Sequence, residues 1–230
     1  MTFSLIGHCE RTGMFGVAIA TSEMAVGSRC IHVAPNVGAV VSQASTNPRL
    51  GHLGLNLLRA GHSAPAVVAQ MTAADQFVER RQLGALDVSG LGAARTGAEN
   101  KAWAGHRVDR HVVVTTNMVV GAAVADGMFE AFQKTADRPL WERLLVALEA
   151  GKAAGGQPNG EISSGLYVVD REPYAIVDLR VDLNPAPVTE LRRLADAYFP
   201  LIPYYYALRP RDPNLPSAPE WLASQPKRAP

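Results

Sequence analysis

The pattern of apolar and polar positions at the start of the chain predicts a β-hairpin. Residues 3–8 and 16–21 are mostly apolar, and the polar turn CERTG between them ends in a glycine that suits a hairpin. A further strand is predicted at GAVVSQAS, residues 38–45. The chain is therefore expected to begin as antiparallel sheet.

The apolar positions change to a helical period after this strand. Leu53, Leu57 and Leu58 recur at helical spacing, and Gly61 stands where a glycine commonly ends a helix. Ser63 is then the expected N-cap of a second helix. Together these features predict a helical hairpin.

The rest of the chain alternates strands and helices again. Strands are predicted at residues 81–87, 91–97, 111–116, 163–170 and 174–182, and those before residue 117 are expected to pair with the first group. Amphipathic helices are predicted at residues 121–133, 139–150 and 186–199, and Gly151 is expected past the end of the second.

The order of these elements predicts the fold class. Antiparallel strands alternating with pairs of helices are typical of stacked sheets with helices outside, and not of a parallel βαβ sheet. We therefore expect an α+β fold with two stacked antiparallel sheets flanked by helices. From Pro200 the sequence is proline-rich and aromatic, so residues 1–200 are predicted to form one domain and residues 201–230 an arm.

Composition narrows the classes of partner. The chain has 230 residues with 47% apolar and 19% charged, which suffices for a buried core. Its net charge is +1 and its basic residues are scattered, so neither nucleic acid nor a membrane surface is an expected partner. No apolar run approaches the roughly 20 residues that span a bilayer. We expect a cytoplasmic protein with free thiols and a small-molecule substrate or metabolite as partner.

The residues that commonly bind metals and cofactors lack the spacing for such a site. The histidines form no HxH or HExxH motif, and Cys9 and Cys30 form no CxxC pair, so both cysteines are expected to be buried and inert. No GxGxxG or GxxxxGK[ST] phosphate loop occurs. The sequence therefore predicts no metal site and no cofactor.

Small polar residues gather instead at the ends of the predicted strands. They are Thr2, Ser22, the run SQASTN at residues 42–47, TTN at 115–117 and EISSG at 161–165. Each alone is typical of a turn or cap. A threonine at a mature N-terminus has a further capacity, because its own α-amine titrates near pH 7 to 8 and can take the hydroxyl proton. Thr2 would reach that state by loss of Met1.

Several blocks of the sequence resemble a known family. They are MTFSLIG, GMFGVAIATSEMAVG, VGAVVSQASTNPRLGHLGLNLLRAG, RRQLGALD, RTGAEN with WAGH, and Asn117-Met118. Over residues 2 to about 180 they are similar to the bacterial domain-of-unknown-function family 1028. That family resembles the N-terminal-nucleophile (Ntn) hydrolases, whose fold is a four-layer αββα sandwich.

The resemblance implies a set of site residues. Thr2 takes the place of the catalytic nucleophile, Ser22 falls where proteasome-type relatives carry an acidic residue, and Glu161 and Ser164 take orienting roles. The loop after the third strand corresponds to the oxyanion-hole loop, and with Asn117 it gives the expected oxyanion and substrate-binding residues Gln43, Ala44, Ser45, Thr46, Asn47 and Asn117. No lysine matches the superfamily position near Gly38, so activation would rest on the α-amine.

Two hypotheses for function follow from these features. The first is an Ntn-type hydrolase of a small amide or related C–N bond. The second is a catalytically silent Ntn fold that binds a small metabolite or acts as an oligomeric accessory protein, which the missing charged residues beside Thr2 favour. A metal-dependent hydrolase is a third hypothesis, which the spacing of the histidines and cysteines does not favour. The apolar tail predicts a homodimer or larger homo-oligomer.

Overall fold

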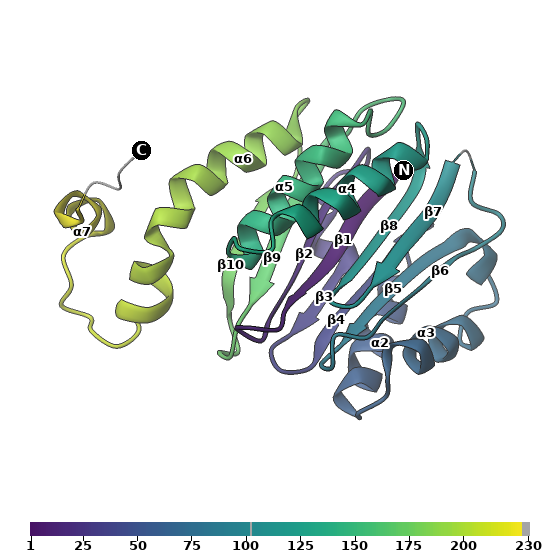
Figure 1. Cartoon of the computed structure of the whole chain (residues 1–230), viewed down its shortest axis with the longest axis horizontal. Helices are drawn as coiled ribbons and strands as arrows, with labels where there is room; N and C mark the ends of the chain where they lie inside the picture. Colours follow the sequence, from purple (N-terminus) through teal and green to yellow (C-terminus); the bar gives the residue numbers. More distant parts are fainter. Residues whose placement is uncertain (102, 227–230) are drawn as a thin grey trace. The chain divides into compact units, whose positions relative to one another are not determined.

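Two antiparallel β-sheets form the centre of the fold (Figure 1). The computed structural model describes residues 1–101 and 103–226. The six-stranded sheet has the order β10-β9-β2-β1-β8-β7, with bounds β1 Thr2–Cys9, β2 Met14–Thr21, β7 Trp103–Asp109, β8 Val112–Val119, β9 Ser163–Val169 and β10 Ala175–Val181. The four-stranded sheet has the order β3-β4-β5-β6, with bounds β3 Ile31–Ala34, β4 Gly38–Ala44, β5 Arg81–Asp87 and β6 Gly92–Thr96.

Helices cover the outer face of each sheet. Helices α4 (Ala122–Lys134) and α5 (Leu140–Ala153) pack on the six-stranded sheet, and α2 (Pro48–Arg59) and α3 (Ala64–Ala73) pack on the four-stranded sheet (Figure 1). The inner faces of the sheets meet in an apolar core that includes Ile6, Phe15, Val17, Val41 and Leu86. The four-layer α+β sandwich expected from the sequence is therefore confirmed.

The helical hairpin forms as predicted, with one difference in its caps. Helix α2 ends in a Schellman motif, because the N–H of Gly61 donates to Leu58 O and that of His62 donates to Leu57 O, with Gly61 at φ +86°. Ser63 holds the N-cap position of α3 but its hydroxyl makes no capping bond. The Asp87 carboxylate accepts from Ala64 N at 2.9 Å instead.

The elements differ from the sequence-based expectations at a few points. Helix α5 continues to Ala153, so Gly151 lies inside it, where the close approach of Met128 leaves no room for a Cβ atom. The short helix α1 (Gly27–Cys30) and strand β3 were not predicted. The later strands do pair with the first group, but they are divided between the two sheets. In the four-stranded sheet β5 pairs with β4 and β6 pairs with β5, whereas in the six-stranded sheet β8 pairs with β1 and β7 pairs with β8.

The chain divides into two compact units at Leu191, within α6 (Pro187–Tyr198). The second unit contains the 3-10 turn Phe199–Leu201, the π-helix Pro203–Leu208 and α7 (Ala218–Ser224). The last four residues of the predicted arm, 227–230, lie outside the described residues. Within the described part of the chain, every helix is too short or too polar to cross a membrane.

Candidate functional site

One row of polar residues crosses four strands of the six-stranded sheet at the N-terminal end of β1. Thr2 stands opposite Asn117 of β8 and Thr21 of β2, and Thr21 stands opposite Ser163 of β9. Directly opposed residues in antiparallel strands share a face of the sheet. Because the Asn117 side chain bonds to Gln82 of the other sheet, this row faces the space between the sheets.

The Thr2 hydroxyl has a defined partner in this row. Its Oγ1 lies 3.1 Å from Thr21 Oγ1, and Thr2 is only 5% exposed. The Thr21 hydroxyl donates to the Met1 carbonyl. Since a hydroxyl has one proton, Thr2 then donates to Thr21. The row therefore fixes the orientation of the Thr2 side chain next to the peptide bond that precedes it.

A buried hydrogen-bond network between the two sheets is connected to the row through Asn117. Ser4 donates to Gln43 Oε1 at 2.7 Å, and Gln43 Nε2 donates to Gln82 Oε1 at 2.9 Å. Gln82 Oε1 also accepts from Asn117 Nδ2 at 3.0 Å. All four residues have no exposed surface, and the Asn117 Oδ1 atom has no partner among the described residues. A buried amide oxygen without a donor is costly, so this atom is available to a group that supplies a proton.

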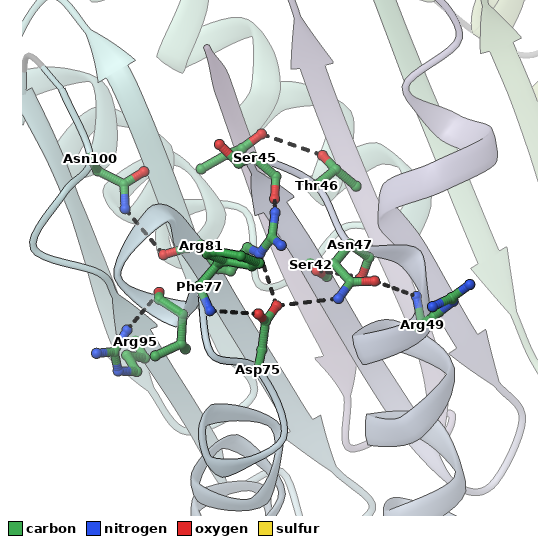
Figure 2. Close-up of polar contacts among 12 residues, drawn as sticks. Ser42, Ser45, Thr46, Asn47, Arg49, Asp75, Phe77, Arg81, Arg95 and Asn100 are labelled. Atoms are coloured by element: carbon green, nitrogen blue, oxygen red, sulfur yellow. Dashed lines mark hydrogen bonds and ion pairs between the residues drawn. The ribbon is translucent and has the colours of Figure 1, made fainter.

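The loop after β4 is held by a buried ion pair (Figure 2). Asp75 accepts from Arg81 Nε at 2.9 Å, from Phe77 N at 2.8 Å and from Asn47 Nδ2 at 3.2 Å. Arg81 also donates to the Ser45 carbonyl. Burial would raise the pKa of Asp75, but these hydrogen bonds together hold it below its usual value. We call this ion pair the Asp75–Arg81 clamp. It holds residues 45–47 at both ends, because Arg81 bonds to Ser45 and Asp75 bonds to Asn47.

The main-chain donors of this loop differ in availability. Ser45 N donates to Arg80 O at 3.2 Å and is occupied. The N–H groups of Thr46 and Asn47 donate to no residue in the described chain. Asn47 also caps α2, because its Oδ1 accepts from Arg49 N. Of the expected oxyanion loop, residues 46 and 47 thus provide the free donors, and Gln43 lies in the buried network.

Three of the five described non-glycine residues with positive φ lie close to the row. Ala25, Ala44 and Met118 have φ between +53° and +70° without being glycine. Ala25 lies in the loop after β2, Ala44 ends β4, and Met118 follows Asn117 at a bulge opposite β7. Such conformations persist only where the surroundings impose them, and they are frequent at functional sites.

The N-terminal amine lies in a partly buried environment next to this loop. Burial lowers the pKa of the Met1 amine, the Glu23 carboxylate opposes that change in part, and Cys30 lies close enough to interact with the amine. The Cys30 sulfur is 3.6 Å from Thr46 Oγ1, and burial raises its pKa, so it stays a neutral thiol. These contacts place the amine, Cys30 and Thr46 in one neighbourhood.

Three expected site residues lie elsewhere or have other partners. Ser164 points to the opposite face from Thr2, where its hydroxyl donates to Pro187 O at 2.9 Å. Glu161 is buried, pairs with Lys152 Nζ at 2.6 Å and accepts from Gln157 N at 2.9 Å. Ser22 is half-buried just beyond β2 and its hydroxyl bonds to no described residue.

Ser163 shares the row with Thr2 in place of Ser164. Its hydroxyl donates to Glu23 O at 2.5 Å and accepts from Val26 N at 3.2 Å. Ser163 thereby ties the loop after β2 to the row. The sequence-based prediction of the site did not include Ser163, Thr21, Glu23, Cys30 or the Asp75–Arg81 clamp. Among these, only Ser163 had a sequence signal, because side chains in the strand segment SSG alternate between the two faces of the sheet.

A pocket of about 340 Å³ borders this end of the sheets. Its lining includes Ala44 and Ser45 of the clamped loop and Met118, which follows Asn117. Arg80, Glu99, Asn100 and Lys101 complete it. Its size suits a small ligand group. Within the described residues, no group of three or more His, Cys, Asp or Glu side chains is arranged to hold a metal ion.

Comparison with known proteins places the chain in a family. The family described as "Family of unknown function (DUF1028)" matches residues 2–191. The chain belongs to DUF1028. The crystal structure of protein SPO2555 from Silicibacter pomeroyi, assigned to DUF1028 as well, is 32% identical, with a TM-score of 0.79 over 86% of this chain and 88% of that chain.

A more distant solved structure also resembles this DUF1028 chain. It is Anbu (ancestral beta-subunit) from Yersinia bercovieri, with 13% identity and a TM-score of 0.40 over 94% of this chain and 98% of that chain. Among curated proteins, none matches the chain. The DUF1028 match covers the whole of the sandwich, and the row around Thr2 lies inside it.

Proposed function

We propose that this DUF1028 chain is an Ntn-type hydrolase of a small amide or related C–N bond, with Thr2 as nucleophile after loss of Met1. The observation that carries the proposal is the Thr2 hydroxyl held in a buried polar row between Thr21 and Asn117. Loss of Met1 would place a free α-amine on the same residue. A hydroxyl and an amine on one buried residue form the nucleophile and base pair that this chemistry requires.

The proposed reaction uses the groups of the row in sequence. The α-amine takes the Thr2 hydroxyl proton while Oγ1 attacks the substrate carbonyl carbon. The unpaired N–H groups of Thr46 and Asn47 are the proposed donors to the resulting oxyanion. The C–N bond then breaks, the ammonium returns its proton to the leaving amine, and water hydrolyses the ester on Thr2 with the amine again as base.

Asn117 has a proposed positioning role. Its Oδ1 is buried and has no partner among the described residues, and Asn117 stands directly opposite Thr2. An α-ammonium on Thr2 would supply a donor for this atom, which would orient the amine toward the hydroxyl. Glu161 and Ser164, which were expected beside the nucleophile, are not given a role in the proposed steps because they bond to Lys152 and Pro187 instead. Ser22, which directly follows Thr21, makes no hydrogen bond with the described residues and is not given a role either.

The test is covalent labelling of Met1-free protein with an electrophilic β-lactone probe. We expect stoichiometric label on wild type, loss of label in Thr2→Ala, and retained label in Thr2→Ser. The matched control is Thr12→Ala in the turn at the far end of the same hairpin, which should label like wild type. Equal labelling of wild type and Thr2→Ala would overturn the proposal.

A silent binding protein is the second candidate, because one observation favours it. No charged side chain bonds to the Thr2 hydroxyl in the described chain, and the buried Glu161 is neutralised by Lys152. Under this alternative the protein stays unlabelled and retains a small metabolite through purification. A homodimer or larger assembly and a cytoplasmic location stay predictions under either candidate.

A further inference from the structure

A second polar pocket lies at the opposite end of β1 from Thr2. Its volume is about 270 Å³, and the β1–β2 turn, the β7–β8 turn, the end of α4 and the start of α5 contribute to it. Three of its lining residues are arginines, namely Arg11, Arg110 and Arg143, and Glu10 is the only carboxylate among the lining residues. The three arginines and the one carboxylate together give an excess of two positive charges.

Arg143 is the residue that most needs a counter-ion. It is 8% exposed, its guanidinium lies 3.9 Å from the centre of the Phe132 ring, and Nη2 donates to Phe132 O at 3.2 Å. Its Nε atom has no partner and it pairs with no carboxylate among the described residues. Burial lowers the pKa of Arg143 and Arg11 adds to this effect, while the Asp137 carboxylate opposes it in part without forming an ion pair among the described residues. A buried cation without a paired anion is costly.

The two turn arginines are free to approach an anion from the solvent side. Arg11 is exposed, and its side chain bonds to no described residue. Arg110 is exposed as well, and its Nη2 donates only to the Ser89 carbonyl at 3.2 Å. Both arginines come from short turns at the ends of strands, so their guanidinium groups and that of Arg143 come from three separate elements.

A pair of histidines forms part of the pocket wall. His8 Nδ1 and His111 Nδ1 are 2.9 Å apart, and burial together with His111 lowers the pKa of His8 to about 4. His8 is therefore neutral at pH 7. His111 Nε2 faces the Glu10 carboxylate at 3.6 Å.

We propose that this pocket binds a dianionic phosphate group, either inorganic phosphate or the phosphoryl group of a small metabolite. Arginines from three separate elements that line one pocket suit the several oxygens of a tetrahedral anion, and the excess of two positive charges matches its charge. The anion supplies the missing counter-charge to Arg143. This site is independent of Thr2 and of the proposed hydrolase.

Titration with inorganic phosphate, followed by calorimetry and by the imidazole NMR signals of His8 and His111, tests the proposal. We expect saturable binding by wild type and a loss of about tenfold or more in affinity for Arg11→Ser with Arg110→Ser, since each removes a charge-assisted hydrogen bond. Arg143→Gln should also weaken binding. The two turn substitutions keep the test valid if Arg143→Gln fails to fold, because both residues are exposed.

Arg59→Ser is the matched control, because it removes the same charge at a different pocket, on α2. Binding should be unchanged in this variant. Glycerol phosphate serves as the second probe, and tighter binding than inorganic phosphate assigns the pocket to a phosphorylated metabolite. The proposal is overturned if millimolar phosphate gives no saturable signal, if Arg59→Ser weakens binding as much as the turn variants, or if acetate binds as tightly as phosphate.

Discussion

At the scale of single residues, Thr21 determines how the Thr2 hydroxyl is held. It accepts from Thr2 and donates to the Met1 carbonyl, and it is 2% exposed. We predict that Thr21→Val, which keeps the shape and removes the hydroxyl, lowers the rate of probe labelling about tenfold, the effect of one buried hydrogen bond. Labelling rates measured by intact-protein mass spectrometry check this.

The control for this prediction is Thr72→Val in α3. The Thr72 hydroxyl donates to Val68 O at 2.7 Å, so the same substitution removes one hydrogen bond away from the row. Labelling of this variant should match wild type. If both variants label alike, Thr21 has no part in positioning the nucleophile.

The α-amine gives the proposed reaction its pH dependence. Burial lowers the pKa of the Met1 amine, and Thr2 itself is more deeply buried than Met1, so the same cause acts on a Thr2 amine. A lowered pKa keeps the neutral base form present at pH 7, and activity falls as acidification protonates it. We predict a labelling rate that is level above about pH 8 and declines below the amine pKa. A rate independent of pH between about 5 and 9 would remove the amine as base.

At this scale the sequence predicts that a polar site lies at the strand ends, but it predicts less well which residues belong to that site. Thr2 and Asn117 could be predicted from their positions at strand ends, and they do share a row. The sequence-based prediction named Ser164, but Ser163 is the residue that stands opposite Thr21. The difference of one residue matters because it moves a side chain to the other face of the sheet. Register depends on pairing between strands far apart in the chain, which local pattern does not contain.

At the scale of elements, the clamp between Asp75 and Arg81 links the end of α3 to the loop after β4. We predict that Asp75→Asn lowers the free energy of unfolding by about 1–2 kcal/mol, because bonds to a charged group are replaced by weaker neutral ones. It should also slow labelling, since the donors at residues 46 and 47 lose their support. Urea unfolding and labelling rates provide the measurement.

The same substitution has a predictable dependence on pH. The folded-state pKa of Asp75 is lowered, so its contribution to stability is complete above the unfolded value near 3.8 and disappears as pH falls through the folded value. The difference between wild type and Asp75→Asn should therefore shrink below about pH 4. Glu130→Gln, which breaks the exposed pair with Lys134, is the control and should change stability little at any pH.

Most elements could be predicted from local pattern, and the exceptions have physical causes. Strand β3 has four residues and α1 has four, too few for a periodic signal. Gly151 is a frequent end signal, yet here it allows α5 to pack closely on α4 through Met128. The placement of β5 beside β4, with β6 on its other side, depends on tertiary packing that hairpin signals do not report.

At the scale of the whole molecule, the sandwich places two different polar sites at the two ends of one strand. The row around Thr2 lies at the start of β1, and the arginine-rich pocket lies at its end. The four-layer architecture could be predicted because element order restricts how two amphipathic sheets are covered. The arginine-rich pocket could not, because its three arginines come from distant parts of the chain.

The central claim is that Thr2 acts as a nucleophile with its own amine free. The most direct measurement is the mass and fragmentation of the N-terminal tryptic peptide after treatment with the β-lactone probe. The account predicts a peptide running from Thr2 to Arg11 with the probe attached to Thr2 and not to Cys9. A peptide that retains Met1 and carries no probe would contradict it.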